Sequence, residues 1–415
     1  MQKTKLSPKF WAALTIFSFV GQVAWVVENM YFNVFIYKMF SASAADISAM
    51  VMASAVVAAL TTIIMGAVSD RLGRRKAFIS VGYLIWGVSI IAFAYIKSVT
   101  LTIVMDCVMT FFGSTANDAA YNAWITDRGD ETNRGKIEGL NSMMPLLAIL
   151  IVFGGFMSFD LDTSEAWTKI YYIIGGLTAL IGVVGFFLID ERKDLTKSKE
   201  KLGEVLLYSF RPSVCAKNSR LYLRLLAFAV FGISIQIFMP YLILYYEKGL
   251  GLDNYVLIMA PAIILAAAVT FFYGRLYDKK GFELSALPCY IMLIVGYAIL
   301  YFCKATALVF VGSLLMMSGY LCGMSVFGAA IRDDIPDGLS GRFQGVRIIG
   351  QVFVPGLIGP AVGAWVLRNA EQIMGDDGTY SFLPNENIFL AAIVPIAVLL
   401  VVWIIKRCRK AEAAR

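Results

Sequence analysis

Two carboxyl groups lie inside long apolar stretches of the sequence. Glu28 belongs to the stretch 10–40, and Asp118 lies in the inner half of the stretch 99–125. A charged side chain at the centre of a membrane helix costs roughly 2.5–3.5 kcal/mol on insertion scales, so such a residue is a functional candidate by default. We interpret both as proton-binding groups. A charge near the adjoining loop is an equal alternative for Asp118, and Asp106 is expected to reach water at the outer end.

Amide and aromatic side chains share a helix face with each carboxyl group. At about 100° per residue, Trp25 and Asn29 fall on the face of Glu28, and similar residues accompany Asp118. Such a polar band suits a water-lined cavity for a polar solute, although amides also hold membrane helices together. The predicted cavity residues are Trp25, Asn29, Asn117, Tyr121, Asn122, Gln236 and Gln351.

Several catalytic and cofactor chemistries are excluded by what the sequence lacks. It contains no histidine, which removes Ser-His-Asp and Cys-His nucleophiles and histidine zinc sites. It also has no Gly-x4-Gly-Lys-Ser/Thr loop to hold ATP. We therefore expect neither an enzyme nor an ATP-driven pump, and we expect no metal and no cofactor. The six cysteines lie in helices or on the cytoplasmic side, so no disulfide is expected.

The elements that position these residues are membrane helices. Hydrophobic residues make up 59% of the 415 residues, and crossing a bilayer takes about 20 apolar residues. The sequence predicts an all-α membrane protein with twelve spans. They are 10–40, 45–69, 77–96, 99–125, 137–158, 167–189, 221–247, 254–276, 283–303, 306–331, 343–367 and 387–405.

An internal repeat relates the two halves of the chain. Asp70 and Asp278 are 208 positions apart, and the same offset relates Glu28 to Gln236 and Arg134 to Arg342. A repeat of this length in a membrane protein indicates two copies of one helical bundle. We predict two pseudo-symmetric six-helix bundles. Their expected ranges are 1–189 and 221–415, joined by a charged cytoplasmic linker at 190–220.

The basic residues predict the orientation in the membrane. All but six of the 36 Lys and Arg residues fall on one side, which the positive-inside rule makes the cytoplasmic side. Both termini are then cytoplasmic, in a multi-pass protein of a cell (inner) membrane. The basic runs all adjoin apolar helices, so they favour contact with a lipid bilayer and not with nucleic acid.

A basic loop between the second and third helices carries a recognisable pattern. It reads Gly-x3-Asp-Arg-x-Gly-Arg-Arg-Lys, and a reduced copy follows the eighth helix. This loop, its position and its repeat resemble the signature of the major facilitator superfamily. The resemblance implies a latch between the two bundles on the inner face, in which Asp70 would cap the start of the eleventh helix near Gly341 and Arg342. A simple topology signal is the alternative. The predicted latch residues are Gly66, Asp70, Arg71, Gly73, Arg74, Arg75, Asp278 and Gly281.

The resemblance implies a secondary transporter that works by alternating access. Acids in the first half and amides in the second resemble sugar porters and, loosely, glycoside cation symporters. We therefore predict proton symport of a small polar solute such as a sugar or glycoside, by a monomer. Sodium coupling is less favoured, because the second helix has no carboxylate between Asp46 and Asp70. The alternatives are proton-driven efflux of drugs or amphipathic compounds, and a non-transporting receptor or scaffold.

Overall fold

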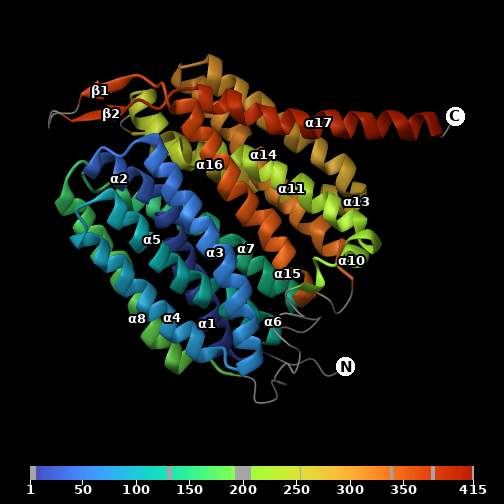
Figure 1. The fold of residues 1–415 in the computed structure, drawn as a ribbon, viewed down its shortest axis with the longest axis horizontal. Coiled ribbons are helices and arrows are strands. Elements are labelled where there is room, and N and C mark those ends of the chain that lie inside the picture. The colour runs from blue at the N-terminus through green and yellow to red at the C-terminus, as the bar shows by residue number, and fades with distance from the viewer. Residues whose placement is uncertain are drawn as a thin grey trace. The chain divides into compact units, whose positions relative to one another are not determined.

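The computed structural model describes residues 6–128, 133–191, 207–252, 254–336, 340–374 and 379–413, and nearly all of them are helical (Figure 1). Eleven helical segments within these ranges are long and apolar enough to cross a membrane. One of them, α13 (Val256–Phe302), contains two predicted spans, because Gly281 interrupts the helix with φ 68° and ψ −175°. Glycine adopts this left-handed φ without steric cost. All twelve predicted spans are therefore helical, and the predicted fold class is confirmed.

Two compact units divide the chain. The first comprises the residues up to Ala42 and Ala53–Leu207. Its helices are α1 (Pro8–Val26), α2 (Phe32–Phe40), the part of α3 (Ala44–Leu72) from Ala53 onward, α4 (Lys76–Ala92), α5 (Val99–Gly113), α6 (Asn122–Arg128), α7 (Arg134–Phe156) and α8 (Ser164–Leu188). We call this unit the N-bundle.

The second unit, the C-bundle, comprises Ser43–Met52 and the residues from Tyr208 onward. It includes a short antiparallel hairpin that pairs Gln372 with Phe382, which the sequence analysis did not anticipate. Its elements are α10 (Pro212–Lys217), α11 (Ser219–Phe238), α12 (Leu242–Leu244), α13, α14 (Thr306–Asp334), α15 (Ser340–Ile348), α16 (Val354–Leu367), β1 (Gln372–Met374), β2 (Tyr380–Phe382) and α17 (Asn387–Ala413).

Local sequence signals explain where several helices begin and end. The side chains of Ser7, Ser98 and Thr163 accept hydrogen bonds from backbone N–H groups in the first turns of α1, α5 and α8. Such caps satisfy donors that have no partner inside the helix. At the other end of α3, Gly73 takes a φ of 62°, and its N–H donates to the carbonyl of Ser69.

Among the described residues, four π-helical turns interrupt the spans, at Val27–Tyr31, Ser114–Tyr121, Tyr245–Gly249 and Ile349–Phe353. The first two contain both predicted proton-binding residues, and the last contains Gln351. A π-helical turn inserts an extra residue into the helix, and such turns occur frequently at functional sites. These turns change which side chains share a helix face. The faces predicted at a constant 100° per residue therefore hold only on one side of each turn.

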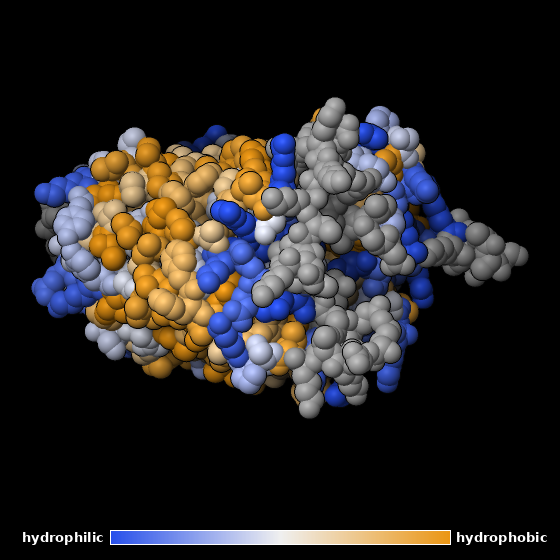
Figure 2. All heavy atoms as spheres, turned by 90° about the horizontal axis from the view of Figure 1, so that it is seen from below, coloured by the Kyte–Doolittle hydropathy of each residue, from blue (hydrophilic) through white to orange (hydrophobic). Residues whose placement is uncertain are grey.

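The helices of each bundle pack through small residues and turn apolar side chains outward. Gly87 of α4 lies against Gly175 and Ala179 of α8, where an added Cβ would meet the Ala179 nitrogen at 2.2 Å. Close backbone contact of this kind is typical of membrane helices. On the face shown in Figure 2, hydrophobic side chains form a broad patch with hydrophilic ones at its borders. Exposed aromatic rings such as Phe187 and Phe302 suit contact with lipid chains.

Candidate functional site

Glu28 is the best-defined polar centre inside the N-bundle. Its side chain is 6% exposed, on the π-helical turn that follows α1. Its Oε1 accepts hydrogen bonds from Ser54 Oγ of α3 at 2.9 Å and Thr110 Oγ1 of α5 at 2.8 Å. The two hydroxyl oxygens are themselves 2.8 Å apart. The second carboxyl oxygen, Oε2, is buried and has no hydrogen-bond partner among the described residues.

Two further carboxyl groups lie near Glu28. Asp106 is 2% exposed, and its Oδ1 is buried with no partner among the described residues. The expectation that Asp106 reaches water is therefore wrong, because the surrounding helices enclose this part of α5. Asp118 is half-buried on the second π-helical turn. The charge of Asp106 acts on Glu28, and that of Asp118 acts on it more weakly.

Three predicted cavity residues of the N-bundle keep exposed or half-buried side chains. The Trp25 ring is half-buried and lies against Trp86, with 4.9 Å between ring centroids. Asn29 is exposed and donates to the carbonyl of Trp25 at 2.8 Å. Asn122 is also exposed and donates to the carbonyl of Asp118 at 3.0 Å. These side chains are accessible to a solute, and they lie within a turn of the two carboxyl groups.

The other two predicted cavity residues of the N-bundle are engaged in helix packing. Asn117 is buried, and its Oδ1 accepts from the Tyr83 hydroxyl at 3.0 Å. The Tyr121 hydroxyl donates to the carbonyl of Leu14 at 2.8 Å, and its ring lies near Trp124. These contacts connect α1, α4 and the second π-helical turn, so the structure gives both residues a packing role.

The C-bundle residues of the predicted cavity are half-buried and lie on different helices. Gln236 of α11 supports close packing, because a Cβ added at Gly359 would lie 2.4 Å from the Gln236 Cβ. Gln351 lies on the π-helical turn between α15 and α16, where its Oε1 accepts from Arg347 Nε at 3.2 Å. Arg347 therefore has a partner one turn away.

Ser54 is a site residue that sequence reasoning missed. It lies in the run Ala53-Ser54-Ala55-Val56, where a single hydroxyl is unremarkable in a membrane helix. The prediction for this helix considered only carboxylates. Thr110 lies in the fourth span, and its partner Glu28 is 82 positions away in the sequence. Only the packing of α3 and α5 against the first span brings the three together.

Arg75 is the centre of the predicted latch loop in the structure. Its guanidinium is buried and pairs with Asp70, with Asp127 at 2.9 Å and with Ser69 Oγ at 2.5 Å. Burial lowers the pKa of Arg75 while the Asp70 and Asp127 carboxylates raise it, and the net change is upward, so Arg75 stays charged. Glu191 Oε1 accepts from the backbone N–H groups of Arg75 and Lys76, which caps α4.

The other loop residues differ in how far the structure explains them. Arg71 and Arg74 are exposed, and Gly73 takes a left-handed φ. At Gly66, an added Cβ would meet nothing within 4 Å among the described residues. For Gly341 and Arg342, the predicted partners of Asp70, the structure describes the backbone alone.

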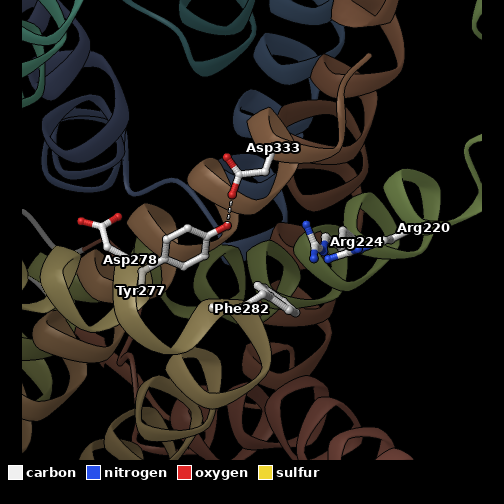
Figure 3. Close-up of a pocket in the computed structure, with 7 residues that line it drawn as sticks. Arg220, Arg224, Tyr277, Asp278, Phe282 and Asp333 are labelled. Carbon is white, nitrogen blue, oxygen red and sulfur yellow. Dashed lines mark hydrogen bonds between the residues drawn. The ribbon is translucent and has the colours of Figure 1, made fainter. Parts of the chain in front are cut away.

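The second copy of the loop borders a cavity of about 390 Å³ in the C-bundle (Figure 3). The Tyr277 hydroxyl donates to Asp333 at 2.5 Å, while the exposed Asp278 points away from that pair. Arg224 of α11 pairs with Asp334 at 2.8 Å. The lining residues are Arg220, Arg224, Tyr277, Asp278, Gly281, Phe282 and Asp333.

Each bundle contains an arginine paired with an aspartate near the end of one of its helices, but the two arginines lie at different positions in the repeat. In the N-bundle, Arg75 follows α3 and binds Asp127 at the end of the fourth span. In the C-bundle, Arg224 comes from the seventh span and binds Asp334 at the end of the tenth. Within the described residues, no group of three or more His, Cys, Asp or Glu side chains is arranged to hold a metal ion.

Comparison with known proteins agrees with this architecture. The nucleoside transporter NupG shares 13% identity with the chain, with a TM-score of 0.73 over 95% of this chain and 98% of that one. A bacterial homologue of the human lysosomal transporter Spinster, in an inward-facing and occupied conformation, shares 14% identity, with a TM-score of 0.66 and 97% of each chain covered. No curated protein sequence matches the chain. The family model of the Major Facilitator Superfamily matches residues 11–360, and the chain belongs to this family of membrane transporters.

Proposed function

We propose that this transporter takes up a small polar solute together with a proton, by alternating access in a cell (inner) membrane with both termini in the cytoplasm. The observation that carries the proposal is the state of Glu28. Its carboxyl group is almost fully buried, one oxygen accepts two hydroxyl hydrogen bonds, and the other has no partner among the described residues. A buried carboxylate without a cation is costly, and one bound proton removes its charge.

A sugar or glycoside is the solute class that the neighbouring side chains favour. Trp25 offers a half-buried aromatic surface, and the exposed amides Asn29 and Asn122 offer donors and acceptors for hydroxyl groups. Stacking combined with amide hydrogen bonds is a common way to bind a polar ring. Nucleosides, the solutes of the nucleoside transporter NupG, are themselves glycosides and belong in the same test panel.

The loop around Arg75 is proposed to act as the gating latch. Asp70 is the exposed partner of a buried arginine, so its charge can change partners when the loop moves. Asp70→Asn should shift the population between inward-open and outward-open states and slow transport, while solute affinity stays within a few-fold. Unchanged turnover, together with unchanged labelling of cysteines from the two membrane faces, would contradict this role.

Uptake into proteoliposomes tests the function. A panel of sugars, glycosides, nucleosides and amphipathic drugs is offered with an inward proton gradient, an outward one, a sodium gradient or none. Accumulation of a polar solute under the inward proton gradient is expected. Accumulation of amphipathic compounds against the proton flow would indicate an exporter, and solute binding without any flux would indicate a receptor or scaffold.

Matched amide variants distinguish the roles of Glu28 and Asp118 in coupling. Glu28→Gln preserves the shape and hydrogen bonding of the protonated residue, so it should lose accumulation and keep solute exchange. If Asp118→Asn loses accumulation and Glu28→Gln does not, coupling belongs to the fourth span. Normal accumulation by both variants would exclude proton symport through these acids.

A further inference from the structure

Two tryptophan rings of the N-bundle meet over a single glycine. The rings of Trp25 and Trp86 have centroids 4.9 Å apart and planes inclined at 50°. A Cβ atom added at Gly113 of α5 would lie 2.8 Å from Trp86 Cε2 and 3.1 Å from Trp25 Cη2. A Cβ atom closer than 3.0 Å to a ring atom would force the ring to move. Only glycine at this position therefore leaves room for both rings where they lie.

Packing, and not a hydrogen bond, sets the position of the Trp86 ring. The ring is fully buried, and its Nε1 has no hydrogen-bond partner among the described residues. Tyr83 packs against it with ring centroids 5.4 Å apart, and the Tyr83 hydroxyl donates to the carbonyl of Phe17 at 2.8 Å. Trp86 therefore resists displacement when a ligand presses on Trp25, because a close-packed interior has no free volume to take up the movement.

The open side of Trp25 belongs to a polar part of the first span. Between residues 11 and 30, the side chains that are not buried fall on one side of the helix and include Thr15, Gln22, Trp25 and Asn29. Along 172–187 of α8, by contrast, every exposed side chain is apolar or aromatic, as expected where a helix faces lipid. Polar side chains within a membrane span turn towards the bundle interior or a water-filled cavity. The accessible face of Trp25 is therefore placed to meet a dissolved solute.

We propose that Trp25 is a fixed stacking surface that selects solutes containing a ring, and that Trp86 and Gly113 position it. The inference rests on the proposed uptake of a polar solute and deepens it by naming the feature of the solute that is recognised. A sugar ring presents a face of C–H groups and a nucleobase a flat π-face, and either can lie against an indole. An open-chain polyol has the hydroxyl groups without the ring. A surface held in place before binding loses little conformational entropy when the solute arrives.

Equilibrium binding of radiolabelled probes to the purified protein tests the selection. The probes are methyl glucoside and uridine, which contain rings, and glucitol and ribitol, which carry similar hydroxyl groups on open chains. We expect the unmodified protein to bind at least one ring probe about tenfold more tightly than its open-chain counterpart. Trp25→Leu should abolish this difference, and Trp25→Phe should restore part of it. Trp11→Leu, at another half-buried tryptophan of the same helix, should leave it unchanged.

The positioning residues are tested by rescue. Gly113→Ala should weaken binding of the ring probe about tenfold, because the added Cβ displaces both rings, and should keep the affinity for the open-chain probe within about twofold. Trp86→Phe alone should reduce the ring preference, since Trp25 loses its support. Added to Gly113→Ala, it removes the atoms nearest to the new Cβ and should recover part of the preference. Gly154→Ala, with nothing within 4 Å of its added Cβ, should bind as the unmodified protein does.

The outcomes separate this inference from the proposed function. Equal binding of ring and open-chain probes, or no binding of either ring probe, overturns the stacking surface, and proton-driven uptake of a polar solute would then still support the proposed function. Ring-selective binding that is lost in Trp25→Leu, without proton-driven uptake, supports the stacking surface and overturns the proposed function. An equal loss of ring and open-chain binding in Gly113→Ala and Trp86→Phe would show that these residues only hold the bundle together, and overturns their positioning role.

Discussion

Replacing Arg75 with methionine should destabilise the N-bundle more than any other change in the basic loop. Methionine keeps much of the volume of the arginine stem and removes the guanidinium. The side chain of Arg75 is 6% exposed, and that of its partner Asp127 is 22% exposed, so water replaces this ion pair poorly. Truncating one member of a buried pair is costly because the other charge is left without compensation.

The size of the effect follows from the three contacts. The charge-assisted bond to Asp127 is worth about 1.5–3 kcal/mol, and the bond to Ser69 about 0.5–1.5 kcal/mol. Asp70 adds little, because its carboxylate is 53% exposed and water screens the pair. We expect a total loss of about 2–4 kcal/mol. For a unit of this size, that corresponds to a melting temperature lower by roughly 5–15 °C.

Thermal unfolding of the purified protein in detergent measures this loss through tryptophan fluorescence. The buried Trp86, Trp124 and Trp167 all belong to the N-bundle and report its melting. Arg74→Met is the matched control, since it removes the same charge from an exposed neighbour in the same loop. Equal melting temperatures for the Arg75 and Arg74 variants would refute the argument that the buried network stabilises the bundle.

Three further changes test other contacts. Gly87→Ala should prevent α4 from packing on α8 and sharply reduce the yield of folded protein in size-exclusion chromatography, whereas Gly176→Ala, with nothing within 4 Å of its added Cβ, should not. Glu191→Ala should cost about 1 kcal/mol in thermal unfolding through the lost cap on α4, and an equally large loss in the exposed Glu371→Ala would contradict that origin. Cutting the chain within 190–220 and co-expressing the two pieces should restore uptake, and fragments that associate stably without transporting would show that the linker is more than a tether.

The sequence by itself determined the number and class of the helices and singled out the polar residues inside them. Apolar length is a sufficient signal for membrane spans, because every backbone group in lipid must be bonded within its own helix. Gly73 and Gly281 both take a left-handed φ, at the end of α3 and at the break in α13. Glu28 was singled out because a carboxyl group in an apolar stretch is costly to bury, and the structure shows it buried.

Only the tertiary structure decided which side chains meet. Ser54 and Thr110 reach Glu28 across 26 and 82 positions, and Asp106 is enclosed where the sequence suggested water. Tyr121 was predicted to line a cavity and instead bonds to the backbone of α1. In a membrane, both the lipid-facing and the core-facing sides of a helix are apolar, so hydrophobicity fixes neither the rotation of a helix nor its neighbours. Each π-helical turn also shifts which side chains share a helix face, and a prediction that assumes a constant helical period misses this shift.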